Sequence, residues 1–532
     1  MTTAAKMIKE GNREAIWNKY CGFLDLTINE YMQIQERLLL EQIDILKDSN
    51  LGVQLLGKKA PKTIEEFQSR VPITTYDYYV PFLIEKDEKD LPTGHYLWAR
   101  TSGRSGTYPC KWIPYTDKIY EKLGEVVIGA MILASCKYKG DVRLEPNDVV
   151  LLATAPLPYT SGYISHATDD QLDVRFVPPL VKAEKMDFGE RISTGFSQTM
   201  DTGLDFFFGL ASVLGKMGER FEEGNASGKP SLAMLKPRTI SRLLQGLIKA
   251  KIAKRNMLPK DIWNLKGVMT GGMDTDIYRK RIENYWGKMP LEGYACTEGG
   301  MLGMQSWNFK GMTLFPDCNF YEFIPFEEHL KLKADPSYQP KTKLMNELTP
   351  GIYEFVFSNF YGGALMRYRV GDLLEVTALK DDETGIQLPQ FQFYSRADDL
   401  IDLGSMARFT ETSIWQSIDD CGVKYVDWMA AKEQEDGKSV LHLYVEVHPS
   451  VEIDHPIIYQ KIKQQMIKVH EDLADMEQIF GDDQMKFTLL PTGAFDRYIE
   501  MQRQAGADLA HIKPAHMQPK PQVIERLLKM EN

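Results

Sequence analysis

The sequence predicts an α/β fold with a large N-terminal domain of β-sheets and helices, a hinge and a small α+β C-terminal domain. The chain has 532 residues, too many for a single compact core, and 43% of them are apolar. Buried-strand and amphipathic-helix patterns alternate through residues 1–395. Residues 403–532 instead show one strand pattern, a charged helix and a polar tail, so we place the hinge at 396–402.

The first elements follow from the spacing of apolar residues. From Ile28 to Leu46 these residues recur at helical intervals, which predicts an amphipathic helix that packs on the main body. DVVLLAT (148–154) and LKGVM (265–269) are typical of buried strands. After TGGM we expect a helix capped by Asp274 or Asp276, with Ile277, Ile282 and Tyr285 on one face.

Later segments predict a strand pair and the small domain. IYEFVFS and ALMRYR favour paired strands across NFYGG, and YRVGD favours a sharp turn into LLEVTAL. In the small domain, VLHLYVEVH predicts a strand and residues 457–472 predict a charged helix.

Composition excludes several classes of function. A net charge of −11 and an acidic pI argue against nonspecific binding to nucleic acid or anionic lipid, so an anion site would have to gather positive charge locally. The six cysteines form no CxxC and the nine histidines no HxxxH, which indicates reduced thiols in a cytoplasmic protein without structural zinc. The N-terminus resembles no targeting segment, and the longest apolar run, Val126 to Cys136, is too short for a membrane anchor.

TSGRSG, residues 101–106, is a candidate phosphate loop. Its glycines allow backbone N–H groups to face an anion, its hydroxyls add donors and its arginine adds charge. It lacks the GxxxxGK[ST] pattern of a P-loop, and taken alone it is explained equally well as a flexible surface loop.

Three further segments each offer one part of a nucleotide site. In YACTE, Tyr294 offers an aromatic face for a base, Thr297 a hydroxyl for phosphate and Glu298 a carboxylate for Mg²⁺, although the segment could be a solvent-facing turn. In YRVGD, Asp372 at a strand end could accept bonds from both ribose hydroxyls, or simply cap a turn. SRADD (395–399) could be a hinge or an ordinary charged linker.

Together, in this order, the four segments resemble the adenylate-forming superfamily of acyl-CoA ligases, luciferases and adenylation domains. Within it the chain looks most like the GH3 acyl-acid amido synthetases, in a bacterial-type form, whose motifs read approximately SSGTS, YASSE and YRxGD. The ending PTGAFDRYIEMQRQAGADLAHIKPAHM is also similar to the GH3 ending. The resemblance implies the adenylate-forming fold, with ATP and Mg²⁺ as cofactors.

The resemblance also implies roles for individual residues. Glu298 would hold Mg²⁺, Asp372 the ribose, and Gly271 and Gly272 the adenine, while Lys513 of the small domain would approach the α-phosphate as a catalytic residue, unless it is a surface lysine on the tail. The remaining nucleotide-binding positions that it implies are Thr101, Ser102, Gly103, Arg104, Ser105, Gly106, Lys111, Tyr294, Thr297 and Arg396.

Two residues depart from the GH3 pattern. Arg104 stands where the family has Thr or Ser, and Cys296 stands where YASSE has its first serine. The distance from TSG to Lys111 is also about one residue longer than usual, so the alignment of this lysine can slip.

The implied reaction is adenylation of a carboxylic acid, followed by transfer of the acyl group to an amine, foremost an amino acid. An acyl-CoA ligase shares the first step and uses a thiol in the second. A nucleotide-binding regulator without turnover is the alternative outside enzymes, although the residue types at Glu298, Asp372 and Lys513 are all present. The expected partners are thus the acid and its acceptor, with no nucleic acid.

Overall fold

The computed structural model of the chain describes residues 3–101, 110–223, 236–271, 275–403, 407–435, 438–452, 454–470, 473, 483–504 and 514–529. The chain divides into two compact units, Met1–Phe393 and Tyr394–Asn532. The segment 396–402 lies at the start of the second unit, and its role as a hinge stays a prediction. Among the helices of the described residues, none is long and apolar enough to cross a membrane.

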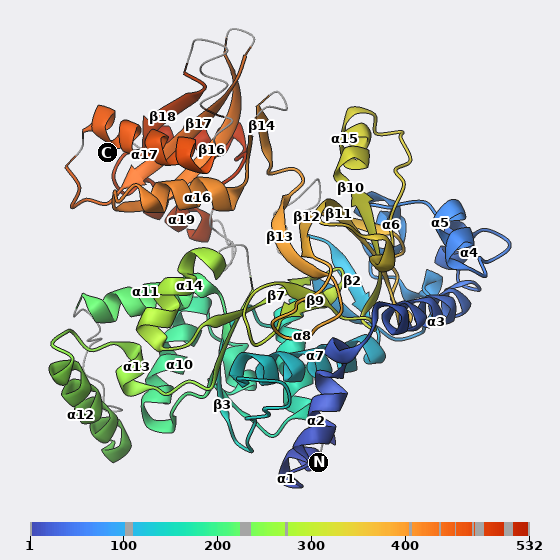
Figure 1. Cartoon of the computed structure of the whole chain (residues 1–532), viewed down its shortest axis with the longest axis horizontal. Helices are drawn as coiled ribbons and strands as arrows, with labels where there is room; N and C mark the ends of the chain where they lie inside the picture. The colour runs from blue at the N-terminus through green and yellow to red at the C-terminus, as the bar shows by residue number, and fades with distance from the viewer. Residues whose placement is uncertain are drawn as a thin grey trace. The chain divides into compact units, whose positions relative to one another are not determined.

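Helices make up much of the first unit (Figure 1). They are α1 (Thr3–Lys9), α2 (Arg13–Tyr20), α3 (Ile28–Leu46), α4 (Asn50–Leu56), α5 (Ile64–Arg70), α6 (Tyr76–Leu83), α7 (Asp117–Ser135), α8 (Thr160–Gln171), α9 (Leu180–Ala183), α10 (Phe188–Thr202), α11 (Ala211–Glu222), α12 (Pro237–Ile252), α13 (Pro259–Ile262), α14 (Thr275–Trp286) and α15 (Phe326–Ala334), with short 3-10 turns at Gly22–Asp25, Glu88–Asp90 and Met345–Glu347.

A long mixed sheet forms the centre of this unit, in the strand order β10-β11-β12-β13-β9-β8-β7-β6-β5-β3-β4. Strands β3 to β7 pair in parallel, whereas β7–β8, β8–β9, β9–β13, β10–β11 and β11–β12 pair antiparallel. The bounds are β3 (Val149–Ala153), β4 (Arg175–Val177), β5 (Phe206–Gly209), β6 (Gly267–Thr270), β7 (Pro290–Cys296), β8 (Gly300–Gln305), β9 (Met312–Leu314), β10 (Asn319–Pro325), β11 (Gly351–Asn359), β12 (Tyr368–Ala378) and β13 (Gln390–Arg396).

Helix α7 lies against strands β6, β7 and β8, while α10 packs on β3 and β4. The approach at β6 is close: a Cβ atom on Gly267 would lie 2.9 Å from the Cβ of Ala134 in α7, so only glycine fits there. Because the carboxyl ends of parallel strands meet at one edge of a sheet, the ends of β3, β5, β6 and β7 form a natural place for a ligand.

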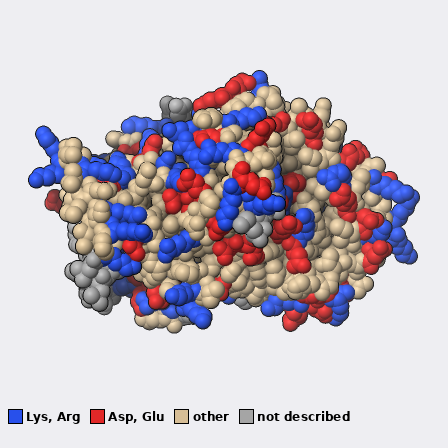
Figure 2. Space-filling view, turned by 90° about the horizontal axis from the view of Figure 1, so that it is seen from below, with Lys and Arg blue, Asp and Glu red and all other residues tan. Residues whose placement is uncertain are grey.

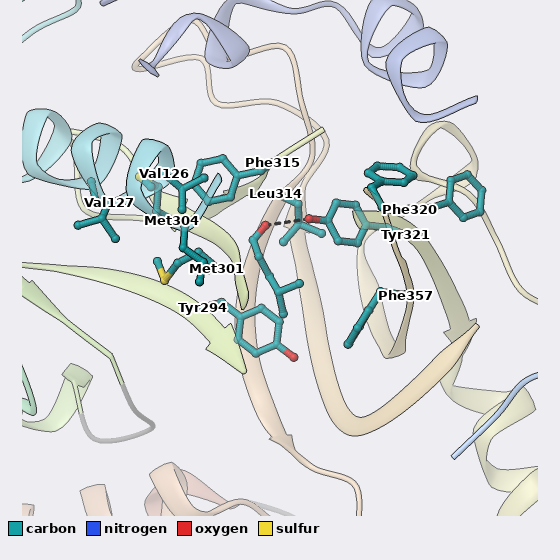
Figure 3. Close-up of a cluster of buried hydrophobic side chains, with 14 of the residues drawn as sticks. Val126, Val127, Tyr294, Met301, Met304, Leu314, Phe315, Phe320, Tyr321 and Phe357 are labelled. Carbon is teal, nitrogen blue, oxygen red and sulfur yellow. Dashed lines mark hydrogen bonds between the residues drawn. The ribbon is translucent and has the colours of Figure 1, made fainter. Parts of the chain in front are cut away.

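The core under this edge is rich in aromatic and methionine side chains. Figure 3 shows Val126 and Val127 of α7 beside Met301 and Met304 of β8, with Tyr294 of β7 nearby. Deeper in the same cluster, the Tyr321 hydroxyl donates a hydrogen bond to the Leu302 carbonyl at 3.2 Å. This packing fixes the two strands whose connection carries the acidic residue Glu298.

Several sequence predictions are confirmed. Helix α3 spans Ile28–Leu46, and its first turn is fixed by Thr27 and Glu30, which cap one another's backbone N–H groups. Strands β3 and β6 lie at the two predicted buried segments, with every residue of both buried. Helix α14 buries Ile282 and Tyr285 as expected, whereas Asp274 and the side chains of Asp276 and Ile277 lie outside the described residues.

The prediction for the YRVGD segment was wrong in two respects. The strand begins at Tyr368 rather than Ala364, and it continues to Ala378 without a turn. Asp372 therefore lies inside β12, not at a strand end. The physical reason is a bulge: the pairing register shifts between Glu354 and Val356, and Gly371 adopts φ +83°. Glycine lets the strand bend here without ending.

The second unit has more regular structure than the sequence predicted. The strand β17 (Lys438–Val447) and the helix α17 (His455–Val469) are confirmed, but the flanking strands and the helix in the polar tail were missed. Strand β17 lies between the other two: it pairs antiparallel with β16 and in parallel with β18. The other elements are β14 (Ile401–Leu403), β15 (Ala407–Phe409), α16 (Glu411–Asp420), β16 (Tyr425–Glu435), β18 (Met485–Leu489), α19 (Ala494–Gln504) and α20 (Pro521–Leu528).

Candidate active site

Three polar side chains from distant parts of the chain meet beyond the end of β7. The Lys111 ammonium donates to Glu298 Oε1 at 3.1 Å and to the Tyr368 hydroxyl at 3.1 Å. Tyr368 in turn donates to the same Glu298 oxygen at 3.1 Å. The side chains of Glu298 and Lys111 are only 8% and 16% exposed. The three groups therefore form a closed, charge-assisted cluster at low dielectric.

The backbone around Glu298 is held from two neighbouring elements. Asn359, at the end of β11, donates from Nδ2 to the Glu298 carbonyl at 3.0 Å, and its Oδ1 accepts from the Leu365 N–H at 3.0 Å. Tyr115, at the end of β2, donates its hydroxyl to the Thr297 carbonyl. After Glu298 the chain reverses at Gly300, with φ +69°, into β8. Thr297 and Glu298 thus sit in a fixed turn.

Lys111 lies in the connection of a β-hairpin, and the same connection contains the predicted phosphate loop. Strands β1 (Leu97–Arg100) and β2 (Trp112–Tyr115) pair antiparallel, and residues 101–111 connect them. Thr101 closes this connection, because its N–H donates to the Lys111 carbonyl at 3.0 Å and its Oγ1 accepts from the Lys111 N–H at 2.9 Å. The predicted loop residues Ser102, Gly103, Arg104, Ser105 and Gly106 lie outside the described residues.

Asp372 and Tyr294 form a second buried pair. The Tyr294 hydroxyl donates to Asp372 Oδ2 at 2.7 Å, and the two residues are 6% and 7% exposed. The Tyr294 ring packs on Phe355 and Phe393, with ring centroids 5.6 and 6.2 Å apart. The sequence did not predict this hydrogen bond, which orients one oxygen of the buried carboxylate.

Burial keeps two ionisable side chains of the site, Cys296 and Tyr368, in their neutral forms. Burial, and then the charges of Glu298 and Asp372, raise the pKa of the Cys296 thiol well above its usual value. Burial and the adjacent Glu298 carboxylate likewise raise the pKa of Tyr368. Both groups are therefore uncharged at neutral pH, so Cys296 is a poor nucleophile here. All six cysteines of the chain are free thiols.

An apolar cavity of about 280 Å³ opens at the same edge of the sheet. Residues at the carboxyl ends of β3, β5, β6 and β7 contribute to its lining: Thr154, Gly209, Gly271 and Thr297. Ile164, Phe208, Met269, Met301 and Met304 contribute to its walls. None of its described lining residues is charged. The cavity thus offers an uncharged, mainly apolar surface next to Thr297, one residue before Glu298.

The donor set at Glu298 fits a magnesium ion that arrives with its nucleotide. Among the described residues, no group of three or more His, Cys, Asp or Glu side chains could hold a metal on its own. Mg²⁺ commonly binds through one or two carboxylates together with substrate phosphates and waters. A single buried carboxylate beside a lysine matches that mode rather than an all-protein metal cage.

The structure therefore brings together part of the predicted set. Lys111 and Glu298 are in contact, and Gly271 and Thr297 line one cavity. Gly272 and Lys513 lie outside the described residues, while Arg396 belongs to the second unit. Sequence reasoning missed Tyr368, Tyr115 and Asn359 as supports of Glu298. Only Tyr368 carried a signal, because it opens the YRVGD segment.

Two stretches of the chain match family models. Residues 21–168 match the GH3 family N-terminal domain, and residues 312–396 match the GH3 family central domain. Lys111 lies in the first stretch, and Tyr368 and Asp372 lie in the second. A stretch of 96 residues is 33% identical to the probable indole-3-acetic acid-amido synthetase GH3.11 of Oryza sativa subsp. japonica. That match covers 18% of this chain and 15% of the rice protein.

Solved structures extend the likeness to most of the chain. An AtGH3.15 acyl acid amido synthetase in complex with 2,4-DB matches with a TM-score of 0.68 at 16% identity, over 97% of this chain and 96% of that one. A 2-hydroxyisobutyryl-CoA ligase in its postadenylation state matches with a TM-score of 0.54 at 14% identity, over 86% and 85%. At these identities the matches establish the fold. Two stretches of this chain therefore match models of the GH3 family N-terminal and central domains, and its mixed α/β fold matches the folds of a solved acyl acid amido synthetase and a solved CoA ligase.

Proposed function

We propose that this protein adenylates a carboxylic acid with ATP and then transfers the acyl group to an amine, an amino acid in the first instance. The observation that carries the proposal is the meeting of Lys111, Glu298 and Tyr368 beside an uncharged apolar cavity at the carboxyl edge of the sheet. The polar cluster of Lys111, Glu298 and Tyr368 is suited to a phosphate chain, and the apolar residues that line the cavity are suited to an acyl group.

In the first step a carboxylate oxygen attacks the α-phosphorus of ATP, the bond from that phosphorus to the oxygen bridging to the β-phosphate breaks, and pyrophosphate leaves. The products are acyl-AMP and pyrophosphate, so the acid has exchanged a poor leaving group for a good one. Negative charge gathers on the oxygens of the α-phosphate, and catalysis therefore consists of positioning and charge stabilisation. Lys111, which pairs with Glu298, would counter this charge.

The other residues would bind and orient the nucleotide. Asp372, held by Tyr294, would accept hydrogen bonds from the ribose hydroxyls, and Gly271 would leave room for adenine beside the acyl cavity. Thr101 and the loop that follows it would hold the β- and γ-phosphates. Glu298 would hold Mg²⁺, which when bound supplies further neutralisation of the phosphate charge.

In the second step the nitrogen of the amine attacks the acyl carbon, the bond from carbon to the AMP oxygen breaks, and nitrogen loses a proton. An amide and AMP result. Lys513 of the second unit would approach the α-phosphate in the first step, and rotation of that unit about 396–402 would separate the two steps. Similarity to a solved CoA ligase favours a second candidate, in which the thiol of CoA is the acceptor.

A screen of carboxylic acids for ATP-dependent pyrophosphate release tests the proposal. Each active acid is then assayed with the twenty amino acids, with CoA and with hydroxylamine, which traps an acyl-AMP without any acceptor specificity. We expect amide formation with at least one amino acid. Formation of acyl-CoA with no amide would replace the proposal with the CoA reaction. The loss of pyrophosphate release in Glu298→Gln, by about 100- to 1000-fold, would tie the activity to this site.

A further inference from the structure

Helix α12 presents its large apolar side chains to solvent rather than to the protein. Its buried residues are the small Thr239, Gly246 and Ala250. The outward residues recur at intervals of four, three, one and four, which places them along one side of a helix. They are Ile240, Leu244, Leu247, Ile248 and Ile252, with exposed fractions of 42%, 55%, 55%, 59% and 78%. We call these five residues the outer face of α12.

The packing of the helix explains why this face cannot turn inward. Gly246 lies so close to the body that a Cβ atom there would be 2.9 Å from the sulfur of Met257 and 3.2 Å from Ile262. The side of the helix that carries the small residues therefore packs closely on the body. The larger side chains of the outer face would not fit between the helix and the body. The outer face remains a mainly apolar strip on the surface, a feature that marks an interaction site.

Positive charge is concentrated in the same part of the chain. Residues 224–260 contain nine Lys and Arg residues and no Asp or Glu, although the net charge of the whole chain is −11. Arg255 is paired with Asp261, but Arg238, Lys251 and Lys254 are exposed along or beside the outer face. Figure 2 shows Lys and Arg side chains around uncharged ones, with few acidic ones, at its left end, where α12 lies in Figure 1.

We propose that the outer face of α12 binds the surface of an anionic membrane, with the helix lying in the plane of the lipid headgroups. The aliphatic strip would enter the boundary between headgroups and acyl chains, and the flanking cations would pair with lipid phosphates. The helix has 16 residues, which suits an interfacial position and is too short to span a bilayer.

Charge and shape disfavour the other occupants. Two copies of the chain joined through this face would bring two positive segments together, which costs electrostatic free energy. A nucleic acid would attract the cations, but its charged backbone would not bury the five exposed aliphatic side chains. An anionic lipid surface complements both features at once. The proposal does not depend on the adenylation reaction, since its evidence and its test concern binding alone.

Co-sedimentation of the full chain with lipid vesicles tests the proposal. Vesicles of phosphatidylcholine mixed with phosphatidylglycerol are compared with vesicles of phosphatidylcholine alone, at low and high salt. We expect binding to the anionic vesicles only, weakened at high salt because charges are then screened. The triple variant Leu244→Gln, Leu247→Gln, Ile248→Gln should reduce the partition coefficient by at least about tenfold, because it removes most of the inserted apolar area.

A matched control separates the face from general surface hydrophobicity. Val53, Leu379 and Ile457 are 49%, 46% and 53% exposed and lie elsewhere in the chain, so their triple replacement by Gln should leave vesicle binding unchanged. Thermal unfolding of both triple variants verifies that each remains folded. Absence of binding to anionic vesicles, or equal binding by the α12 variant, would overturn the proposal. So would a dimer of the wild-type chain that the α12 variant converts to a monomer.

Discussion

Lys111 and Glu298 lie far apart in the sequence, and in the structure they form the buried ion pair of the candidate site. A lysine in a hairpin connection and a glutamate after a strand have many ordinary explanations, and the sequence alone could not distinguish them. The spacing of the motifs pointed to both residues. The pairing itself, and the part played by Tyr368, required the structure, because they depend on how strands β2, β7 and β12 come together.

Removal of the lysine should destabilise the protein strongly. Lys111→Met leaves the buried Glu298 carboxylate without its cation, and we expect the free energy of unfolding to fall by about 3–5 kcal/mol. In a Glu298→Gln background the same change should cost much less, because a neutral amide needs no cation. Urea denaturation of the four proteins of this cycle measures the difference.

An exposed ion pair provides the control for this cycle. Lys118 pairs with Glu121, and both side chains are more than half exposed. Lys118→Met should therefore change the stability by no more than about 1 kcal/mol. The decisive comparison is the cost of Lys111→Met in the wild type against its cost in the Glu298→Gln background. An identical loss of stability in the two backgrounds would show that the ion pair does not stabilise the site.

Asp372 should govern recognition of the ribose. Calorimetric titration of the wild type with ATP and with 2′-deoxy-ATP should show a preference for ATP of about 10- to 100-fold, as expected for a hydrogen bond to a charged acceptor. Asp372→Asn should lose most of that preference. Tyr294→Phe keeps the Asp372 carboxylate and should retain more of the preference for ATP than Asp372→Asn does. An Asn variant that discriminates as well as the wild type would remove Asp372 from the ribose site.

At the scale of elements, the bulge in β12 places Asp372. The sequence suggested a turn at this glycine because glycine after a strand pattern usually ends the strand. The bulge could not be predicted, since it depends on the register with β11, which is a long-range property. Helix α3 was predictable residue by residue, because its periodicity and its capping box are local signals.

Gly371→Ala tests this view of the bulge. Alanine at φ +83° costs roughly 1–2 kcal/mol, and relief of the strain would move the adjacent Asp372. Gly385 has a similar φ of +80° in an open turn, so Gly385→Ala carries the same strain away from the site. We expect both variants to be destabilised alike, but only Gly371→Ala to bind ATP more weakly. Unchanged ATP affinity in Gly371→Ala would argue against the positioning role.

In the second unit, His516 anchors the segment that follows Lys513. Its ring lies between Glu411 at 2.5 Å and Asp427 at 2.8 Å, stacks on Trp428, and its carbonyl accepts from the Ala430 N–H. Burial alone would lower the pKa of His516, but the Asp427 and Glu411 carboxylates outweigh it and raise the pKa to about 9. The histidine is therefore charged at neutral pH.

This raised pKa predicts a pH-dependent stability. Stabilisation from a raised pKa is fully present below the unfolded-state value near 6.5 and is lost as pH rises through about 9. We expect the free energy of unfolding of the second unit to fall by about 3 kcal/mol across that window, and His516→Asn to abolish the dependence. His448→Asn, at an exposed position, is the control. Denaturation monitored by tryptophan fluorescence at several pH values, in the wild type and in the two variants, measures the effect, and a flat profile in the wild type would contradict it.

For the whole molecule, the sequence led to the correct fold class because its motifs occur in a specific order along the chain. The apolar cavity at the carboxyl edge of the sheet could not be predicted in the same way. Its lining comes from two helices and several strand ends, and each residue, Met304 for example, has an ordinary core pattern around it. The substrate of a site built from such residues depends on their three-dimensional arrangement, which periodicity does not encode.

We expect a carboxylic acid to become linked to AMP at the site of Lys111, Glu298 and Asp372. The transfer of an oxygen atom from the acid to AMP reveals this link. An active acid labelled with ¹⁸O in its carboxylate is incubated with ATP, the amine acceptor and the protein, and the AMP is analysed by mass spectrometry. We expect AMP that carries ¹⁸O from the acid, because the bridging oxygen stays on phosphorus when the acyl carbon is attacked. Unlabelled AMP, or ADP and phosphate as products, would contradict it.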